Sequence, residues 1–184
     1  MIQNTITGRS YTYGMFSNTA FLGAGNTTHI GVFSGDAATI TTAMKAYYRD
    51  TAKPLTNPSN LEVWDASTLA TFGLTDTNFL GVFVCNEAVT RTIDSVTGSL
   101  TFNLSATGGD LISLKSGTPS VFVLRYSTVA SSTVSFASFA ASSGANVIMF
   151  GTVGDENSEA DLKILGGALT QGQHYRMTDL TINF

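Results

Sequence analysis

The chain is built of short apolar segments separated by turn-forming residues. Each segment is rich in β-branched and aromatic residues, and most are bounded by Gly, Asp, Asn, Ser or Thr, which is the pattern of strands and turns. The segments recur about every 8–12 residues, a rhythm typical of sandwiches and jelly rolls. The predicted strands lie at residues 28–33, 61–64, 69–74, 79–85, 88–93, 99–104, 111–114, 121–126, 133–139, 147–153, 161–165 and 175–184.

These segments predict an all-β fold of the antiparallel β-sandwich or jelly-roll-like type, with at most one short helix. The only candidate for a helix is residues 36–48, where Asp36 could act as the N-terminal cap. On a helix, its large apolar residues would share one face: Ile40, Met44 and Tyr47. The β-branched residues in the middle fit a strand at residues 39–49 instead, and the sequence leaves both possibilities open.

Two further patterns concern strand pairing. Residues 88–93 and 99–104 flank turn-forming residues and predict a β-hairpin. Residues 175–184 alternate between polar and apolar positions, with a one-residue slip at Thr178 and Asp179 that suggests a bulge. Because the final residue, Phe184, is apolar, we expect the C-terminal segment to be docked in a sheet.

Residues 1–28 differ from the rest, because polar residues and glycines interrupt any long element there. Four aromatic residues in this segment are candidates for an interface: Tyr11, Tyr13, Phe16 and Phe21. The segment is either an arm that lies on a neighbouring subunit or the first strand of the same domain. Residues 29–184 are predicted to form one β-sandwich domain, since a chain of 184 residues can bury a core without disulfides or metals.

The composition narrows the possible partners. Charged residues make up 12% of the chain, about half the usual share, and the net charge is −4. The nine basic residues are scattered, so we expect no nucleic acid as a partner. No apolar run is long enough to span a bilayer, and no signal peptide is visible, so we expect no membrane partner and assembly in a cytoplasm. The single cysteine, Cys85, excludes an intrachain disulfide and a multi-cysteine zinc site.

Catalytic patterns are few. The two histidines, His29 and His174, are not accompanied by a G-x-S-x-G motif, and most carboxylates occur one per turn, as capping residues do. We therefore expect no enzyme and no cofactor. A carbohydrate site is conceivable where Trp64, Tyr47 and Tyr48 could lie near Asp65, although a Trp in an alternating strand more often belongs to the core.

One acidic cluster stands apart from this distribution. Four carboxylates within residues 155–161 could hold Ca²⁺ through oxygen ligands: Asp155, Glu156, Glu159 and Asp161. The cluster lacks EF-hand spacing, so the favoured alternative is an exposed acidic loop in which Asp161 caps a turn.

The C-terminal quarter carries a family resemblance. Residues 150–154 (FGTVG), 160–162 (ADL), 169–173 (LTQGQ) and 180–182 (LTI) together resemble the C-terminal signature of small β-rich virion structural proteins, encoded in the head and tail gene modules of tailed bacteriophages. The signature is built on turn residues, here Gly151, Gly154, Asp161, Gly166 and Gly172. The signature indicates a fold architecture and a virion context, and it does not indicate a chemical reaction.

The resemblance implies a structural virion protein, most simply a capsid decoration or cement protein. Such a protein would bind the major capsid protein or neighbouring virion proteins and its own copies, as a homo-oligomer with the symmetry of a trimer or ring. The alternative is a tail or head-to-tail component, including a carbohydrate- or receptor-binding fibre-type β-sandwich.

Overall fold

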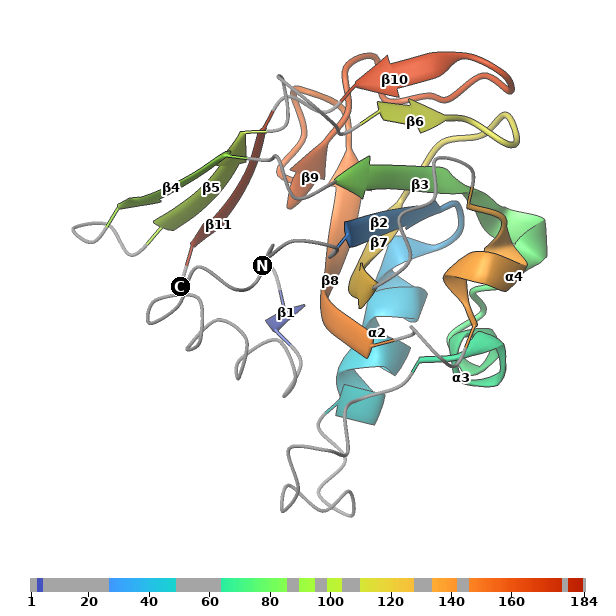
Figure 1. Ribbon diagram of the computed structural model, residues 1–184. Helices are drawn as coiled ribbons and strands as arrows, with labels where there is room; N and C mark the ends of the chain where they lie inside the picture. Colours follow the sequence, from blue (N-terminus) through green and yellow to red (C-terminus); the bar gives the residue numbers. More distant parts are fainter. Residues whose placement is uncertain are drawn as a thin grey trace.

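A computed structural model describes residues 3–4, 27–48, 64–85, 90–94, 99–103, 110–127, 134–141, 146–176 and 179–183 (Figure 1). Most of the regular structure in these residues is strand. The strands are β1 (Gln3–Asn4), β2 (Thr27–Phe33), β3 (Phe79–Cys85), β4 (Thr90–Asp94), β5 (Ser99–Asn103), β6 (Asp110–Ile112), β7 (Val121–Ser127), β8 (Asn146–Gly154), β9 (Leu162–Lys163), β10 (His174–Arg176) and β11 (Asp179–Asn183). The helices are α2 (Ala37–Tyr48), α3 (Ala66–Thr71), the 3₁₀ helix η2 (Asp76–Asn78) and α4 (Phe136–Phe139).

The main sheet has β2 near its centre. Its strands follow the order β1-β8-β7-β2-β3-β6-β10, and β9 pairs with β8 outside this path. All of these pairings are antiparallel except that of β8 with β9, so the sheet is mixed, and it curls visibly in Figure 1. A separate three-stranded sheet has the order β11-β5-β4, and its β4–β5 pairing confirms the predicted hairpin.

The predominance of strand confirms the coarse fold prediction, whereas the expectation of at most one helix was wrong. The stretch that the sequence left open, residues 36–48, is helix α2. Helices α3 and α4 replace the strands expected at residues 69–74 and 133–139. Two facing sheets of a sandwich are not evident among the residues that the structure describes.

Capping explains why α3 and α4 form. The carboxylate of Asp65 accepts a hydrogen bond from the Thr68 amide at 2.9 Å, and the Ser135 hydroxyl accepts one from the Ser138 amide at 3.2 Å. Each bond satisfies an amide that the first turn of a helix would otherwise leave unpaired. In a segment of four to six residues, alternating apolar positions do not separate one helical turn from a strand.

Helix α2 forms in spite of its β-branched residues. Asp36 accepts hydrogen bonds from the Thr39 hydroxyl and from the Ala38 amide, and these bonds hold the pKa of its carboxyl below the ordinary value. The Thr41 hydroxyl donates to the Ala37 carbonyl one turn earlier, so its polar group is satisfied within the helix. The predicted apolar face is confirmed, with Ile40 and Met44 buried and Tyr47 packed against the same core.

The central strands are buried on both faces. On β2, Phe33 belongs to the core beneath the helices, while Ile30 and Val32 point to the opposite face and are also buried. Strands of this kind read as continuous apolar runs, as β3 and β7 do. The core on the helix side comprises Phe33, Ile40, Met44, Trp64, Leu69, Phe72, Leu74, Phe79, Val82, Val121, Val123, Val134, Phe139, Ala140 and Phe150.

Residues 134–141, which we term the cover segment, lie directly on β2. A Cβ atom at Gly31 would be 2.5 Å from Cζ of Phe139, closer than any side chain can approach. The absence of a side chain at Gly31 is therefore what lets the Phe139 ring reach the sheet. From there the ring packs 6.0 Å from Phe33 and 5.4 Å from Phe79, centroid to centroid.

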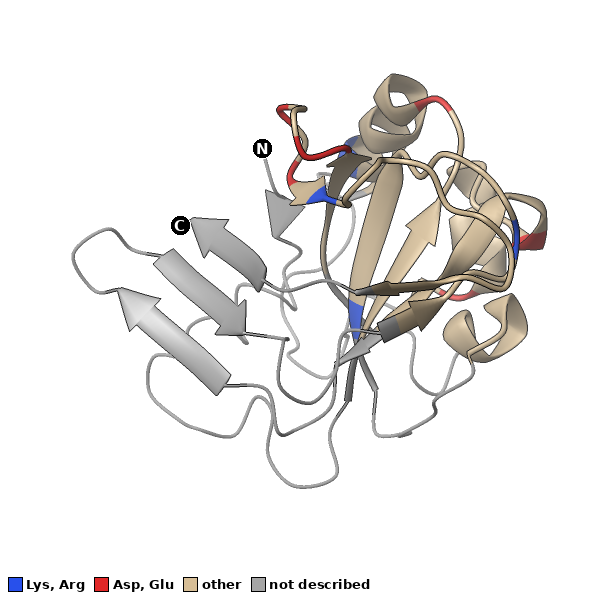
Figure 2. Cartoon of the chain, turned by 90° about the horizontal axis from the view of Figure 1, so that it is seen from above, with Lys and Arg blue, Asp and Glu red and all other residues tan. Residues whose placement is uncertain are grey.

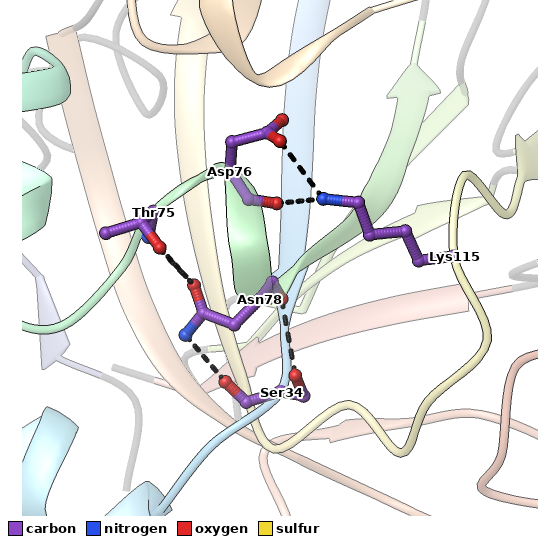
Figure 3. Close-up of polar contacts among 5 residues, drawn as sticks. All are labelled: Ser34, Thr75, Asp76, Asn78 and Lys115. Carbon is purple, nitrogen blue, oxygen red and sulfur yellow. Dashed lines mark hydrogen bonds and ion pairs between the residues drawn. The ribbon is translucent and has the colours of Figure 1, made fainter.

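A polar contact fixes the end of β2 to the start of β3 (Figure 3). The Asn78 side chain donates to the carbonyls of Ser34 and Gly73, both at 2.9 Å, and accepts from the Thr75 amide at 2.8 Å. Beside it, Lys115 forms an ion pair with Asp76 at 3.2 Å. The Asn78 side chain thus pairs with backbone groups of the segment after β2 and of the segment before β3. These groups have no partner within the described sheet.

The C-terminal pattern has a different cause from the one predicted. Residues 175–184 were expected to form one strand with a bulge, but β10 pairs with β6 in the main sheet and β11 pairs with β5 in the other sheet. The slip at Thr178 and Asp179 falls between β10 and β11, which pair in different sheets; residues 177–178 themselves lie outside the described part. The pairing of β11 confirms that this segment is docked in a sheet.

We predict that Gly31→Ala destabilises the protein by about 1–3 kcal/mol, because the new methyl group must displace the Phe139 ring from a packed core. The free energy of unfolding, measured with urea, checks this. In a Phe139→Leu background the same change should cost clearly less, since the ring that it meets is gone. Strictly additive costs in the double variant would show that the two residues do not compete for space.

Candidate interaction surface

Most of the C-terminal signature, all but residues 180–182, lies in residues 146–176, where the chain makes an unusually short parallel return. Strand β9 pairs in parallel with the end of β8, Val153 opposite Leu162 and Gly154 opposite Lys163. A parallel pair normally needs a crossover of a dozen or more residues, but here residues 155–161 alone join the two strands. The loop must therefore be held by specific contacts.

Thr152 and Asp161 form the main contact that closes this loop. The Asp161 carboxylate accepts from the Thr152 amide and from the Thr152 hydroxyl, both at 3.0 Å, and the Asp161 amide donates back to that hydroxyl at 3.2 Å. A Cβ at Gly151 would lie 2.7 Å from the same carboxylate and 2.8 Å from the Phe122 ring. Asp161 thus joins the two ends of the loop through Thr152, and Gly151 makes the room for its carboxylate.

The loop is tightened further from within. A Cβ at Gly154 would lie 2.8 Å from Cβ of Ser158 and 2.9 Å from Cβ of Ala160. The Asp155 side chain accepts from the Asn157 amide at 3.0 Å, and the Asp155 carbonyl accepts from the Ser158 hydroxyl at 2.7 Å. Gly154 is therefore required by close packing, and Asp155 forms an Asx-type turn.

Glu156 joins the loop to the next turn. Its carboxylate accepts from the Gly166 amide at 2.8 Å, and hydrogen bonds from its own amide and from that of Gly166 lower its pKa. The Gly167 amide donates to the Ile164 carbonyl at 3.0 Å, and Gly166 has φ +77°, as a type II turn requires. At the tip of this turn, the Leu165 side chain is 81% exposed.

The four acidic residues of the calcium hypothesis do not converge. Asp155, Glu156 and Asp161 accept hydrogen bonds from three different parts of the segment. Glu159 is exposed. Within the described ranges, no three His, Cys, Asp or Glu side chains gather as metal ligands would. The carboxylates of Asp155, Glu156 and Asp161 therefore stabilise the loop through hydrogen bonds.

The second half of the segment is fixed to residues 113–117. Leu169 and Gly117 exchange two backbone hydrogen bonds at 2.8 and 2.9 Å, and the Gly172 amide donates to the Ser113 carbonyl at 2.8 Å. Gly172 also has φ +77° in a turn closed by the Gln173 amide and the Thr170 carbonyl. The signature residues Gly166 and Gly172 thus occupy equivalent positions in two successive type II turns.

Large apolar side chains are exposed at three places in the described part: Ile112, Leu114 and Leu165. Ile112 and Leu114 are 43% and 40% exposed, and Ile112 is the register partner of the exposed His174 on β10. Figure 2 shows that charged residues are confined to few positions of the described part, several of them in the loop that precedes Leu165. An apolar side chain on a rigid turn is the kind of group that protein interfaces bury.

Trp64 is in the core and is unsuited to a carbohydrate site. Its side chain is 1% exposed and packs against Phe72 at 4.9 Å, Phe150 at 5.3 Å and Tyr47 at 6.0 Å between ring centroids. Asp65 is occupied as the cap of α3. The core alternative for Trp64 is therefore confirmed, and the side chain of Tyr48 lies outside the described part.

His29 is equally unsuited to the role of a catalytic base. It is buried, and its neighbour across the strands is a cation, Arg125, rather than an orienting carboxylate. Burial, and next the charge of Arg125, lower the pKa of His29 to about 4. Arg125 was not among the predicted site residues, although a charged residue within the apolar run of β7 (VFVLRYS) is a visible signal.

The four aromatic residues predicted as interface candidates lie outside the described residues: Tyr11, Tyr13, Phe16 and Phe21. Of residues 1–26, only Gln3 and Asn4 are described, and they pair with Phe150 and Met149 of β8. Among the helices that the structure describes, none is long and apolar enough to cross a membrane.

No family model, no curated protein and no solved structure matches this chain. The resemblance in the C-terminal quarter therefore stays a prediction from the sequence.

We predict that Asp161→Ala destabilises the protein by about 1–3 kcal/mol, since the Thr152 amide and hydroxyl lose their acceptor. Glu159→Ala is the matched control, because it removes an exposed carboxylate of the same loop and should change the stability by less than about 0.5 kcal/mol. Thermal unfolding of both variants checks this, and equal effects would refute the assigned role of Asp161.

Proposed function

We propose that the protein is a structural component of a tailed-phage particle, a capsid decoration or cement protein that binds the capsid shell and its own copies. It acts by binding alone, without a cofactor and without catalysing a reaction. On this proposal it assembles in the host cytoplasm and resides in the virion as a homo-oligomer, a trimer or ring that matches the symmetry of the shell.

The observation that carries the proposal is the geometry of the signature segment. Its turn residues Gly151, Gly154, Asp161 and Gly166 all take part in holding a short loop and turn, at the tip of which Leu165 is exposed. A preorganised apolar side chain binds a partner with little loss of conformational entropy.

Low charge supports the same proposal. With 12% charged residues, the chain has little of the charge that keeps a free monomer soluble. Interface cores are depleted of charged residues, so partners that cover part of the surface would account for the composition. The sandwich or jelly-roll arrangement belongs to the proposal as well, and the mainly antiparallel pairing supports it.

The alternative is a tail or head-to-tail component, including a fibre-type protein that binds carbohydrate or a receptor. The burial of Trp64 removes the aromatic residue on which a carbohydrate site would have centred. A tail or neck position needs no such site and is distinguished from a capsid position by location and copy number.

Quantitative mass spectrometry of intact particles and of tail-stripped heads, scaled to the major capsid protein, tests the proposal. We expect the protein to remain on the heads in a copy number comparable to that of the shell protein. A few copies that are lost with the tails would favour the alternative, and absence from purified particles would refute both.

A second experiment tests whether Leu165 is part of the interface with the capsid. Heads that lack the protein are incubated with purified wild-type protein or with Leu165→Ser, and the bound fraction is measured after sedimentation. We expect Leu165→Ser to bind at least about tenfold more weakly, as loss of a buried anchor does. Ala70→Ser, at an exposed position of α3, is the control; equal binding of all three proteins would exclude Leu165 from the interface.

A further inference from the structure

A histidine and an arginine lie side by side in the core. His29 on β2 and Arg125 on β7 are register partners, so their side chains share one face of the main sheet, the face that also carries Gly31. Their exposed fractions are 1% and 4%. Two ionisable groups are thus held together where water does not reach them.

Arg125 holds the cover segment onto the sheet. Its guanidinium donates to the carbonyl of Phe139 and, at 3.2 Å, to that of Ser138, and it lies 4.8 Å from the centroid of the Phe139 ring. Both carbonyls are at the end of α4, where few amides remain to pair with them: the Ser138 carbonyl also accepts a long hydrogen bond from the Ala141 amide, at 3.4 Å. If Arg125 moves, the carbonyls of Ser138 and Phe139 lose the hydrogen bonds from its guanidinium, and the Phe139 ring loses its contact with the cation.

Among the described residues, no hydrogen bond stabilises a positive charge on His29. Neither of its ring nitrogens, nor Nε of Arg125, has a hydrogen-bond partner there. The residue opposite His29 on β3 is Val84, and the cover segment (VSFASFAA) contains no ionisable side chain. The next carboxylate residue in register is Asp110 on β6, two strands away from His29, so the charged residue directly beside His29 on a neighbouring strand is the cation Arg125.

We propose that His29 and Arg125 form an acid-sensitive latch, in which protonation of His29 repels Arg125 and releases the cover segment from the main sheet. The low pKa of His29, about 4 against an ordinary 6.5, agrees with this geometry. Because the closed form disfavours the proton, open and unfolded forms bind it more readily between these two values. The latch is therefore fully closed above about pH 6.5 and is progressively weakened as the pH falls toward 4.

The latch is independent of the proposed function, since it follows from the core alone. If the protein does decorate a particle, the latch would make its core sensitive to acid while the C-terminal segment stays folded. If the protein acts elsewhere, the same response is expected.

The test compares wild type with His29→Gln, using the fluorescence of the sole tryptophan during urea unfolding at several pH values from 7 to 4. Between pH 7 and pH 4 the ratio of folded to unfolded wild type should fall by about 100-fold more than that of the variant, because the pKa of His29 is about 4 in the folded protein against 6.5 in the unfolded chain. His174→Gln, which removes an exposed imidazole, should retain the wild-type profile. Equal pH profiles for wild type and His29→Gln would refute the latch.

Two further measurements keep the test decisive. If His29→Gln does not fold, the His29 ring protons of the wild-type protein are followed by NMR, and titration near pH 6.5 in the folded state would refute the latch. Hydrogen exchange at pH 5 then locates the opening. The amides of residues 138–141 should exchange faster than those of β2 and β7; simultaneous exchange of all of them would mean that acid unfolds the core without releasing the cover segment first.

Discussion

The interaction on which the described core depends is the contact between the buried guanidinium of Arg125 and the last carbonyls of α4. Burying a guanidinium is costly, and the cost is offset here by two charge-assisted hydrogen bonds and by the face of the Phe139 ring. The contact fixes the position of the cover segment. Phe139 then fills the space above Gly31, and the aromatic rings of Phe33 and Phe79 pack against it.

A second constraint shapes the chain at the C-terminal end of β8. The chain returns in parallel beside its own strand after a loop too short for a crossover helix, and the reciprocal bonds of Thr152 and Asp161 make that return possible. Two glycines are needed there for space, at Gly151 and Gly154, and Gly166 is needed for its positive φ. These residues of the C-terminal signature are thus explained by backbone geometry and close packing. On the function proposed above, they matter because they hold the turn that presents Leu165.

Much of the fold could be predicted from the pattern of apolar residues. Long apolar runs bounded by turn residues located β2, β3 and β7 correctly, and turn chemistry located the β4–β5 hairpin. Helices α3 and α4 could not be recognised, because each is about one or two turns long, which is too short for a helical period to show in its apolar residues. A slip in alternation has two physical causes, a bulge or a change of sheet, and only tertiary pairing separates them.

The candidate site shows the same limit. The sequence placed four carboxylates in one short loop, but which atoms they bind depends on the return of the chain to Thr152 and on the turn at Gly166. The pairing of His29 with Arg125 follows from the register of β2 with β7, and no local pattern encodes that register. Residues far apart in sequence meet only through the order of strands in the sheet, so the contact of His29 with Arg125 could not be predicted from the sequence.

The measurement that tests this account most directly is the free energy of unfolding of Arg125→Met at pH 7, beside that of Arg125→Lys. Methionine fills a similar volume but removes the donors that the guanidinium offers to the Phe139 carbonyl and to that of Ser138, which keeps only the long bond from the Ala141 amide, so we expect a loss of about 2–4 kcal/mol. Lysine retains the charge but not the paired donors and should fall between wild type and the methionine variant. An Arg125→Met protein as stable as wild type, with the amides of α4 equally protected from exchange, would contradict the account.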